Sequence, residues 1–262
     1  MPWVTRGLRN GVLTSPYPRR PDGYGADWRG AVSVRPQVGA AAGRSAKELC
    51  PTGAIGQDAG GGVVLDRGKC ILCGRCVAAR PDLFGFDPSP EVASPTRAGL
   101  VVPEAEENDG ALAEARADLG QRVRALRRSV HVRHVDAGSD GSEEWEIAAL
   151  LNPVYDVHRL GIFFTASPRH ADLLLISGAG SAGMAGPVRT TYEAMPDPRV
   201  VVAVGTDAAS GGMVSPTYAT RGGVGDLVPV DVWVPGSPPS PFSILHGILL
   251  AVGLIPERKG RR

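Results

Sequence analysis

Runs of apolar residues alternate with helical patterns through the second half of the chain. Five short segments rich in Val, Ile and Leu have the pattern of strands: 130–135, 161–166, 171–177, 200–205 and 230–234. Apolar residues at helical spacing predict helices at 143–151, 186–195 and 243–254. Continuously apolar strands alternating with helices are typical of a parallel sheet covered on both faces, so residues 130–256 predict an α/β domain.

The first half of the chain has shorter and weaker patterns. Residues 32–34 and 63–65 predict short strands, and 45–49 and 75–79 predict short helices. Together these features indicate a small α+β module at residues 31–92.

Three further segments complete the expected organisation. Residues 1–30 show no helix or strand period and are expected to form an extended N-terminal arm. Residues 93–129 are expected to be a linker followed by a helix from Asp109, and 257–262 a basic tail. The arm is either disordered or a strap whose arginines meet an acidic partner.

Four cysteines, the only ones in the chain, lie within the small module. Cys70, Cys73 and Cys76 form a Cys-x2-Cys-x2-Cys run, and Cys50 precedes Pro51 upstream. Bacterial-type ferredoxins use C-x2-C-x2-C-x3-C-P motifs, in which the fourth cysteine of one motif binds the cluster of the other. The pattern therefore predicts one [4Fe–4S] cluster held by these four cysteines in a ferredoxin-like module.

The missing positions of the double motif support this assignment. Counting with the same spacing places the lost cysteines at Ala40, Gly43, Ala46 and Arg80. These four would have bound one cluster, and the four survivors would bind the other. A structural zinc site and a pair of disulfides remain alternatives, although zinc sites favour paired C-x2-C units. A cluster would require a reducing compartment, where thiolates stay available as ligands.

The charge and hydropathy of the chain argue against two classes of protein, nucleic-acid-binding proteins and membrane-spanning proteins. The chain of 262 residues has a net charge of +1, which provides no electrostatic basis for nucleic-acid binding. No run of 18 uncharged apolar residues predicts a membrane span, and the start lacks the apolar region of a signal peptide. We therefore expect a cytoplasmic protein without a direct membrane span.

Gly-rich loops with oxygen side chains follow three of the predicted strands. They cover residues 136–143, 206–212 and 235–239. In an open parallel sheet the working crevice lies beyond the carboxyl ends of the strands. The three loops are therefore expected to meet at one edge of the sheet.

Four stretches in this half resemble the small subunit of membrane-bound, formate hydrogenlyase-type [NiFe] hydrogenases and the corresponding small subunit of NADH-quinone oxidoreductase (complex I). The stretches are residues 129–139, 147–153, 166–172 and 230–236. The resemblance implies a flavodoxin-like sheet and a peripheral position on the cytoplasmic face of a membrane. It also implies partners, namely a hydrogenase- or complex I-type large subunit and membrane subunits. The cysteine-bearing half resembles the polyferredoxin partner of the same complexes.

The chain departs from that family at its cluster ligands. The four cysteines of the family fall on Asp140, Glu143, Asp207 and Ser237. Oxygen side chains are hard ligands, whereas iron–sulfur clusters prefer soft thiolates. The cluster that the family holds at this edge of the sheet is therefore expected to be absent, which leaves a degenerate site.

Three functions fit these observations. The chain is expected to be an iron–sulfur electron-transfer subunit of a hydrogenase- or complex I-related oxidoreductase, with no catalytic residues of its own. The alternatives are a non-redox scaffold with a structural cluster, or a site where Asp140, Glu143 and Asp207 bind a hard divalent ion. Asp140 acting as a simple helix cap is favoured over ion binding.

Overall fold

The computed structural model describes residues 2–20, 28–35, 46–103, 109–125, 129–214 and 216–255. Ala40 and Gly43, the first residue of the helix predicted at 45–49, and the tail predicted at 257–262 lie outside these ranges. The other predicted site residues lie within them.

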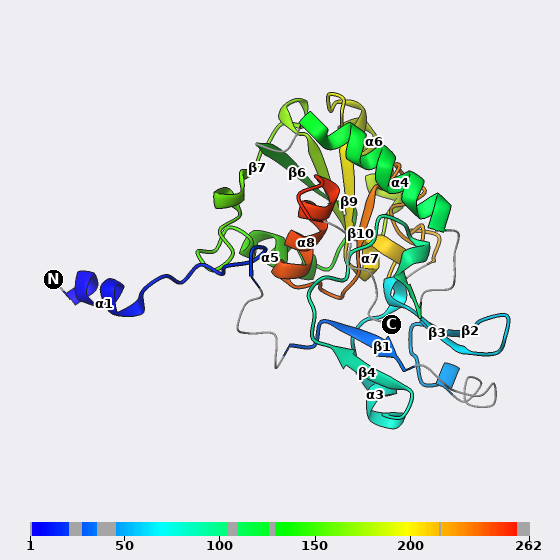
Figure 1. Ribbon diagram of the computed structural model, residues 1–262. Coiled ribbons are helices and arrows are strands. Elements are labelled where there is room, and N and C mark those ends of the chain that lie inside the picture. Colours follow the sequence, from blue (N-terminus) through cyan, green and yellow to red (C-terminus); the bar gives the residue numbers. More distant parts are fainter. Residues whose placement is uncertain are drawn as a thin grey trace.

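A five-stranded parallel sheet forms the centre of the second half (Figure 1). Its strands are β6 (Val130–Asp136), β7 (Ile162–Phe164), β8 (Leu173–Ser177), β9 (Val200–Val204) and β10 (Val232–Val234). They lie in the order β10-β9-β8-β6-β7, and every neighbouring pair is parallel. This is the flavodoxin-like strand order, so the predicted fold class is confirmed.

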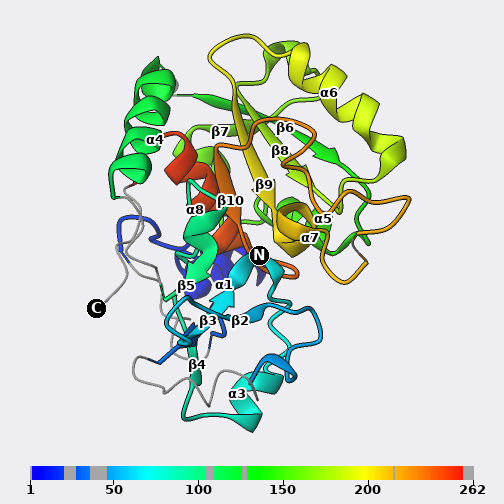
Figure 2. The same ribbon diagram turned by 90° about the vertical axis from the view of Figure 1, so that its right-hand side faces the viewer.

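Helices cover both faces of the sheet (Figure 2). One face packs against α4 (Asp109–Arg122), α5 (Ser142–Ala149) and α8 (Pro241–Ala251). The other packs against α6 (Ala185–Glu193) and α7 (Gly205–Ser210). Every residue of β8 and β9 is buried, because alternate side chains enter the two opposite cores. This double burial explains their continuously apolar sequences.

The cysteine-bearing module is a small α+β unit with its own core. Strand β1 (Ala31–Val34) pairs with β4 (Phe84–Asp87), and β3 (Val63–Asp66) pairs with β2 (Ile55–Gln57) and β5 (Val101–Val102), all antiparallel. The module also contains helix α3 (Arg75–Ala79). Phe84, Leu65 and Ile55 fill the core beside Cys70 and Cys76. The expected ferredoxin-like module is thus a separate packing unit.

Short 3-10 turns connect these elements. They are η2 (Arg67–Lys69), η3 (Ala98–Leu100), η4 (Val123–Ala125), η5 (Val157–Leu160), η6 (Pro168–His170) and η7 (Ala182–Met184).

The segment expected to be a linker is part of both folding units. Residues 101–102 supply β5 to the module's sheet. Ser94 exchanges two backbone hydrogen bonds with Trp233, of 2.9 and 2.8 Å, and so pairs with β10 at the edge of the large sheet. Pairing here covers backbone groups that would otherwise be open to other chains. The residues before 104 are therefore structural, which the linker prediction did not anticipate.

Two local predictions were wrong. The arm expected to lack helix begins with α1 (Pro2–Asn10). The Gly-rich segment expected to be a loop after β9 forms α7 instead. Both helices are short, so each offers few residues in which a helical period can be recognised.

Candidate cluster site

The cysteine run is shaped by a turn and a short helix. Cys70 directly follows η2, and Cys76 lies in α3. Gly74 lies between them with a φ of 73°, and an added Cβ would come within 3.2 Å of the Phe86 ring. A left-handed residue this close to an aromatic ring needs to be glycine, so Gly74 allows α3 to begin directly after it.

The four thiols are near enough to affect one another. All four are free of disulfides. The pKa of Cys70 is raised to about 11, chiefly by burial and then by the charges of Cys76, Cys50 and Cys73. Burial also raises the pKa of Cys76, with additional contributions from the charges of Cys50 and Cys73. Cys50 is thus near enough to the Cys-x2-Cys-x2-Cys run for its charge to act on Cys70 and Cys76.

Cys50 has a different environment. Burial acts to raise its pKa, but hydrogen bonds from the Thr52 side chain and from backbone N–H groups outweigh it, and the net pKa is lowered. The Ala54 N–H lies 3.2 Å from the Cys50 sulfur, and the Thr52 hydroxyl lies 3.4 Å from it. Backbone donors to ligand sulfurs are one means by which proteins tune cluster potentials.

The residues at two of the lost cysteine positions have other roles. Ala46 is fully buried in the module's core. Arg80 forms two hydrogen bonds with Asp82 at the surface, of 2.9 and 2.7 Å. Neither side chain offers a soft ligand. The surviving set offers four free thiols, and the Ala54 N–H is directed at the Cys50 sulfur, which is the chemistry expected of [4Fe–4S] ligands.

The degenerate positions lie at the carboxyl edge of the large sheet: Asp140 and Ser237 are in loops, Glu143 is in α5 and Asp207 is in α7. Asp140 accepts hydrogen bonds from the Ser142 hydroxyl and N–H, at 2.6 and 2.9 Å, which lower its pKa. Asp140 precedes Gly141, the N-cap residue of α5, and no side chain among the described residues caps this helix, so the expectation that Asp140 is the helix cap is wrong. Ser237 follows β10 and is partly exposed, and within the described part of the chain it makes no hydrogen bond to the other three residues.

Glu143 is the most unusual of these residues. Its side chain is completely buried, and burial raises its pKa to about 7, with further contributions from the charges of Asp207 and Asp140. Oε2 accepts a hydrogen bond of 3.1 Å from Ser142, whereas Oε1 has no partner among the described residues. A Cβ at position 205 would lie 2.5 Å from Oε1, and Gly205 has a φ of 94°. Glycine at this position makes room for the buried carboxyl group.

Asp207 is close to the same group. Burial raises its pKa, and the charges of Asp140 and Glu144 add to the effect. The structure thus brings three of the degenerate residues near enough for their charges to interact: Asp140, Glu143 and Asp207. Among the described residues, no group of three or more His, Cys, Asp or Glu has the arrangement of a metal-ion site.

Sequence reasoning missed a polar chain beside this cluster of acids. Glu144 accepts hydrogen bonds from Ser139, at 2.6 Å, and from the buried Ser177. Ser177 in turn lies 2.9 Å from Nε2 of His134, whose pKa burial lowers. The position of Ser177 at the end of β8 was the available signal, since it lies at the same edge of the sheet as the loop after β6.

The cysteine run and the degenerate site are in direct contact. The Thr206 hydroxyl in α7 donates a buried hydrogen bond of 3.0 Å to the Cys70 carbonyl. A small hollow is lined by Cys70 and Leu72 from one module and by Pro235 and Gly236 from the other. The Cys70 loop therefore lies against two of the segments that carry the degenerate positions.

Arg97 fastens the two modules beside this contact. Its guanidinium forms a two-pronged ion pair with Asp66, at 2.7 and 2.8 Å, and its Nε donates to the Ala209 carbonyl at 2.9 Å. Bidentate pairs of this kind are geometrically specific. The relative position of the cysteine loop and α7 is thus fixed by side chains as well as by packing.

Two family models match the chain. Residues 141–251 match the NADH ubiquinone oxidoreductase 20 kDa subunit, and residues 63–118 match a 4Fe-4S single cluster domain. The second match contains Cys70, Cys73 and Cys76, whereas Cys50 precedes it. The two folding units seen in the structure thus correspond to two different family descriptions.

Known proteins show the same likeness. Formate hydrogenlyase subunit 7 of Escherichia coli is 38% identical over 150 residues, which are 57% of this chain and 58% of that protein. A probable membrane-bound hydrogenase subunit of Pyrococcus furiosus is 40% identical over 134 residues, 51% of this chain and 80% of that protein. The chain thus spans little more than half the length of the first relative.

A solved structure is also similar. A chain of the membrane-bound sulfane sulfur reductase, an archaeal respiratory membrane complex, is 30% identical, with a TM-score of 0.45 over 50% of this chain and 73% of that one.

The flavodoxin-like sheet and the two family models together define an iron–sulfur oxidoreductase component with a fused ferredoxin-like module. The chain belongs to the family of the NADH-ubiquinone oxidoreductase 20 kDa subunit, which its hydrogenase relatives share.

Proposed function

We propose that the chain is an electron-transfer subunit of a hydrogenase- or complex I-related, membrane-associated oxidoreductase. It would hold one [4Fe–4S] cluster through Cys50, Cys70, Cys73 and Cys76. The names of the relatives, a formate hydrogenlyase subunit and a membrane-bound hydrogenase subunit, support this class of complex. The match to a single-cluster domain supports the cofactor.

The protein would hold and adjust the cofactor with its own groups. When bound, the cluster supplies a site that accepts and releases one electron. The four thiolates would be its ligands, and the Ala54 N–H would stabilise negative charge at the Cys50 sulfur. Burial of Cys70 and Cys76 limits the access of water to that side of the site.

A second part of the proposal is that the edge of the large sheet holds no cluster. Asp140, Glu143, Asp207 and Ser237 supply only oxygen atoms, which iron–sulfur clusters bind poorly. The hydrogen bond from Thr206 to the Cys70 carbonyl carries the functional argument. It supports a route in which the ferredoxin-type cluster, beside the edge where the lost cluster would have been, serves the large subunit directly.

The expected partners follow from the same family. They are a hydrogenase- or complex I-type large subunit and membrane subunits, with the chain peripheral to the cytoplasmic face of the membrane. None of the described helices is long and apolar enough to cross a membrane. Nucleic acid is not among the proposed partners, because the net charge of the chain is only +1.

A second candidate is a scaffold subunit with a structural cluster. The completely buried Glu143 favours it, because a carboxyl group occupies a position that is a cysteine ligand in the family. Loss of that cluster would interrupt the family's electron route unless the neighbouring module replaces it. The two candidates differ in whether the remaining cluster exchanges electrons with the complex.

Metal analysis of anaerobically purified protein tests the proposal. We expect about four irons and four sulfides per chain, and one EPR signal after reduction. Cys73→Ser should remove most of the iron, whereas Ser237→Ala should leave it unchanged. About eight irons would refute the empty site, and zinc without sulfide would refute the cluster. Rapid reoxidation of the reduced cluster by the assembled complex would distinguish the electron carrier from the scaffold.

A further inference from the structure

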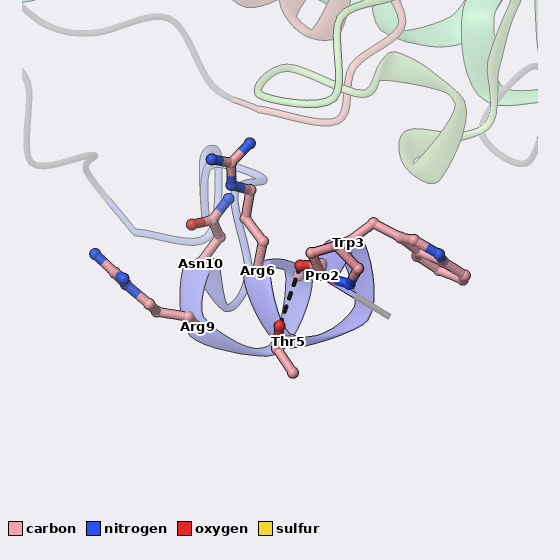
Figure 3. Close-up of a pocket in the computed structure, with 7 residues that line it drawn as sticks. Pro2, Trp3, Thr5, Arg6, Arg9 and Asn10 are labelled. Atoms are coloured by element: carbon pink, nitrogen blue, oxygen red, sulfur yellow. Dashed lines mark hydrogen bonds between the residues drawn. The ribbon is translucent and has the colours of Figure 1, made fainter.

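Helix α1 stands away from the rest of the molecule (Figure 1). None of its residues is buried, and Trp3 and Leu8 are 73% and 80% exposed. The hollow drawn in Figure 3 is lined by residues of α1 alone. One helix cannot enclose a small molecule, so this hollow is an open surface.

The helix has two chemically distinct sides. At 100° per residue, Trp3, Val4 and Leu8 lie on one side, and Arg6 and Arg9 lie on the other. Trp3 and Arg9 point in opposite directions (Figure 3). The apolar side is therefore available to an external surface along the whole helix.

The connection between α1 and the sheet domain is short and fixed. The Thr14 hydroxyl and the Ser15 N–H donate to carbonyls at positions 153 and 154, at 2.9 and 2.8 Å. The Tyr17 ring is buried, and its centroid lies 5.7 Å from that of Phe242. Only three residues separate the end of α1 from this attachment, so the helix is confined to one side of the domain.

A nine-residue helix is too short to be stable in water alone. Exposed Trp and Leu side chains add to the cost, because apolar area stays in contact with water. A surface that buries Trp3, Val4 and Leu8 would stabilise the helix. Among the described residues nothing buries this side of α1, so such a surface would lie outside them.

The charge of the segment identifies the chemistry of that partner. Residues 2–20 contain Arg6, Arg9, Arg19 and Arg20 and no acidic residue, although the remaining chain has more acidic than basic residues. We propose that α1 lies in the surface of a membrane that contains anionic lipids. Trp3 and Leu8 would enter the boundary between headgroups and acyl chains, and Arg6 and Arg9 would meet lipid phosphates.

This inference goes beyond the proposed function. A peripheral subunit would then contact lipid directly, in addition to its contact with membrane subunits. The inference depends on residues of α1 and not on the cluster, so a failure in the metal analysis would leave it intact.

Vesicle flotation with the full chain tests the proposal. We expect binding to vesicles of phosphatidylcholine and phosphatidylglycerol, weaker binding to phosphatidylcholine alone, and release as salt is raised. Arg6→Gln with Arg9→Gln should weaken binding by about fivefold for each arginine. Trp3→Ala with Leu8→Ala should weaken it by about tenfold or more.

Matched variants show whether vesicle binding depends on α1 itself or only on the total charge and hydrophobicity of the chain. Arg19→Gln with Arg20→Gln removes the same charge outside the helix, and Trp28→Ala removes a tryptophan that is 38% exposed. Both should reduce binding less than the corresponding α1 variants. Failure of the unmodified chain to bind anionic vesicles would overturn the proposal and leave a protein groove as the partner. Equal binding by the α1 variants would overturn it as well.

Discussion

The buried carboxyl group of Glu143 should make the stability of the protein strongly dependent on pH. Its pKa is raised from 4.5 to about 7, chiefly by burial and then by the charges of Asp207 and Asp140. A protonated Glu143 is therefore favoured in the folded protein, whereas the unfolded chain ionises near the ordinary value. Stability is fully present below the unfolded pKa and falls as pH rises through the folded pKa. At about 1.4 kcal/mol per pKa unit, the loss is about 3 kcal/mol.

Glu143→Gln removes this ionisation and keeps the size of the side chain. Between about pH 5.5 and pH 8 the free energy of unfolding of the unmodified protein should fall by about 2 kcal/mol more than that of the variant. This pH window covers most of the interval between the unfolded and the folded pKa of Glu143. For a chain of this size the difference corresponds to about 4–8 °C in Tm. Asp207 also has a raised pKa, so some dependence on pH should remain in the variant.

Thermal unfolding of both proteins, followed by circular dichroism at the two pH values, measures this difference. Glu114→Gln serves as a control, since that side chain is exposed. The control should behave as the unmodified protein does at both pH values. If the difference in Tm between Glu143→Gln and the unmodified protein is the same at both pH values, the reasoning from burial is refuted.

Two other changes test the contact between the modules, and a third tests cluster binding. Arg97→Ala should destabilise the protein by about 1–3 kcal/mol, because Asp66 loses its partner, and Arg97→Lys should restore only part of this in denaturant titrations. Thr206→Val should lower the free energy of unfolding by about 1 kcal/mol, because the Cys70 carbonyl loses a buried donor. The same variant should alter the EPR signal of the cluster. An unchanged signal would show that α7 does not influence the cluster. Chelation of iron should lower Tm in the unmodified protein and have little effect in Cys73→Ser, and an equal effect in both would contradict cluster binding.

The large sheet could be predicted because the burial of its strands leaves a pattern within each short stretch of sequence. Strands β8 and β9 are buried on both faces, so each appears as an unbroken apolar run. Helix α7 could not be predicted in the same way. Its sequence begins with Gly205 and Thr206, and its stability comes from packing and from the bond to Cys70. Short strands such as β2 offered too few residues for a period to appear.

The candidate site was predictable to a similar extent. The spacing of Cys70, Cys73 and Cys76 is typical of the ligands of a [4Fe–4S] cluster, and this assignment stays a prediction. The approach of Cys50 follows from the same motif, and the electrostatic effect on Cys70 agrees with it. The hydrogen bond between Thr206 and Cys70 joins residues 136 positions apart, and no local sequence pattern predicts such a bond. The role of Glu144 was missed for the same reason, because Ser177 is 33 positions away.

The two sites have opposite chemistry although they touch. The cysteine side retains soft ligands and N–H donors to sulfur, whereas the edge of the sheet has buried acids around Glu143. A protonated carboxyl group is neutral, so the edge can remain packed without a metal to balance its charge. Gly205 leaves the space that this carboxyl group fills, and Thr206 joins the same helix to the Cys70 loop. The buried acids and Gly205 therefore preserve the surface against which the cysteine loop packs, as the proposal of an empty edge requires.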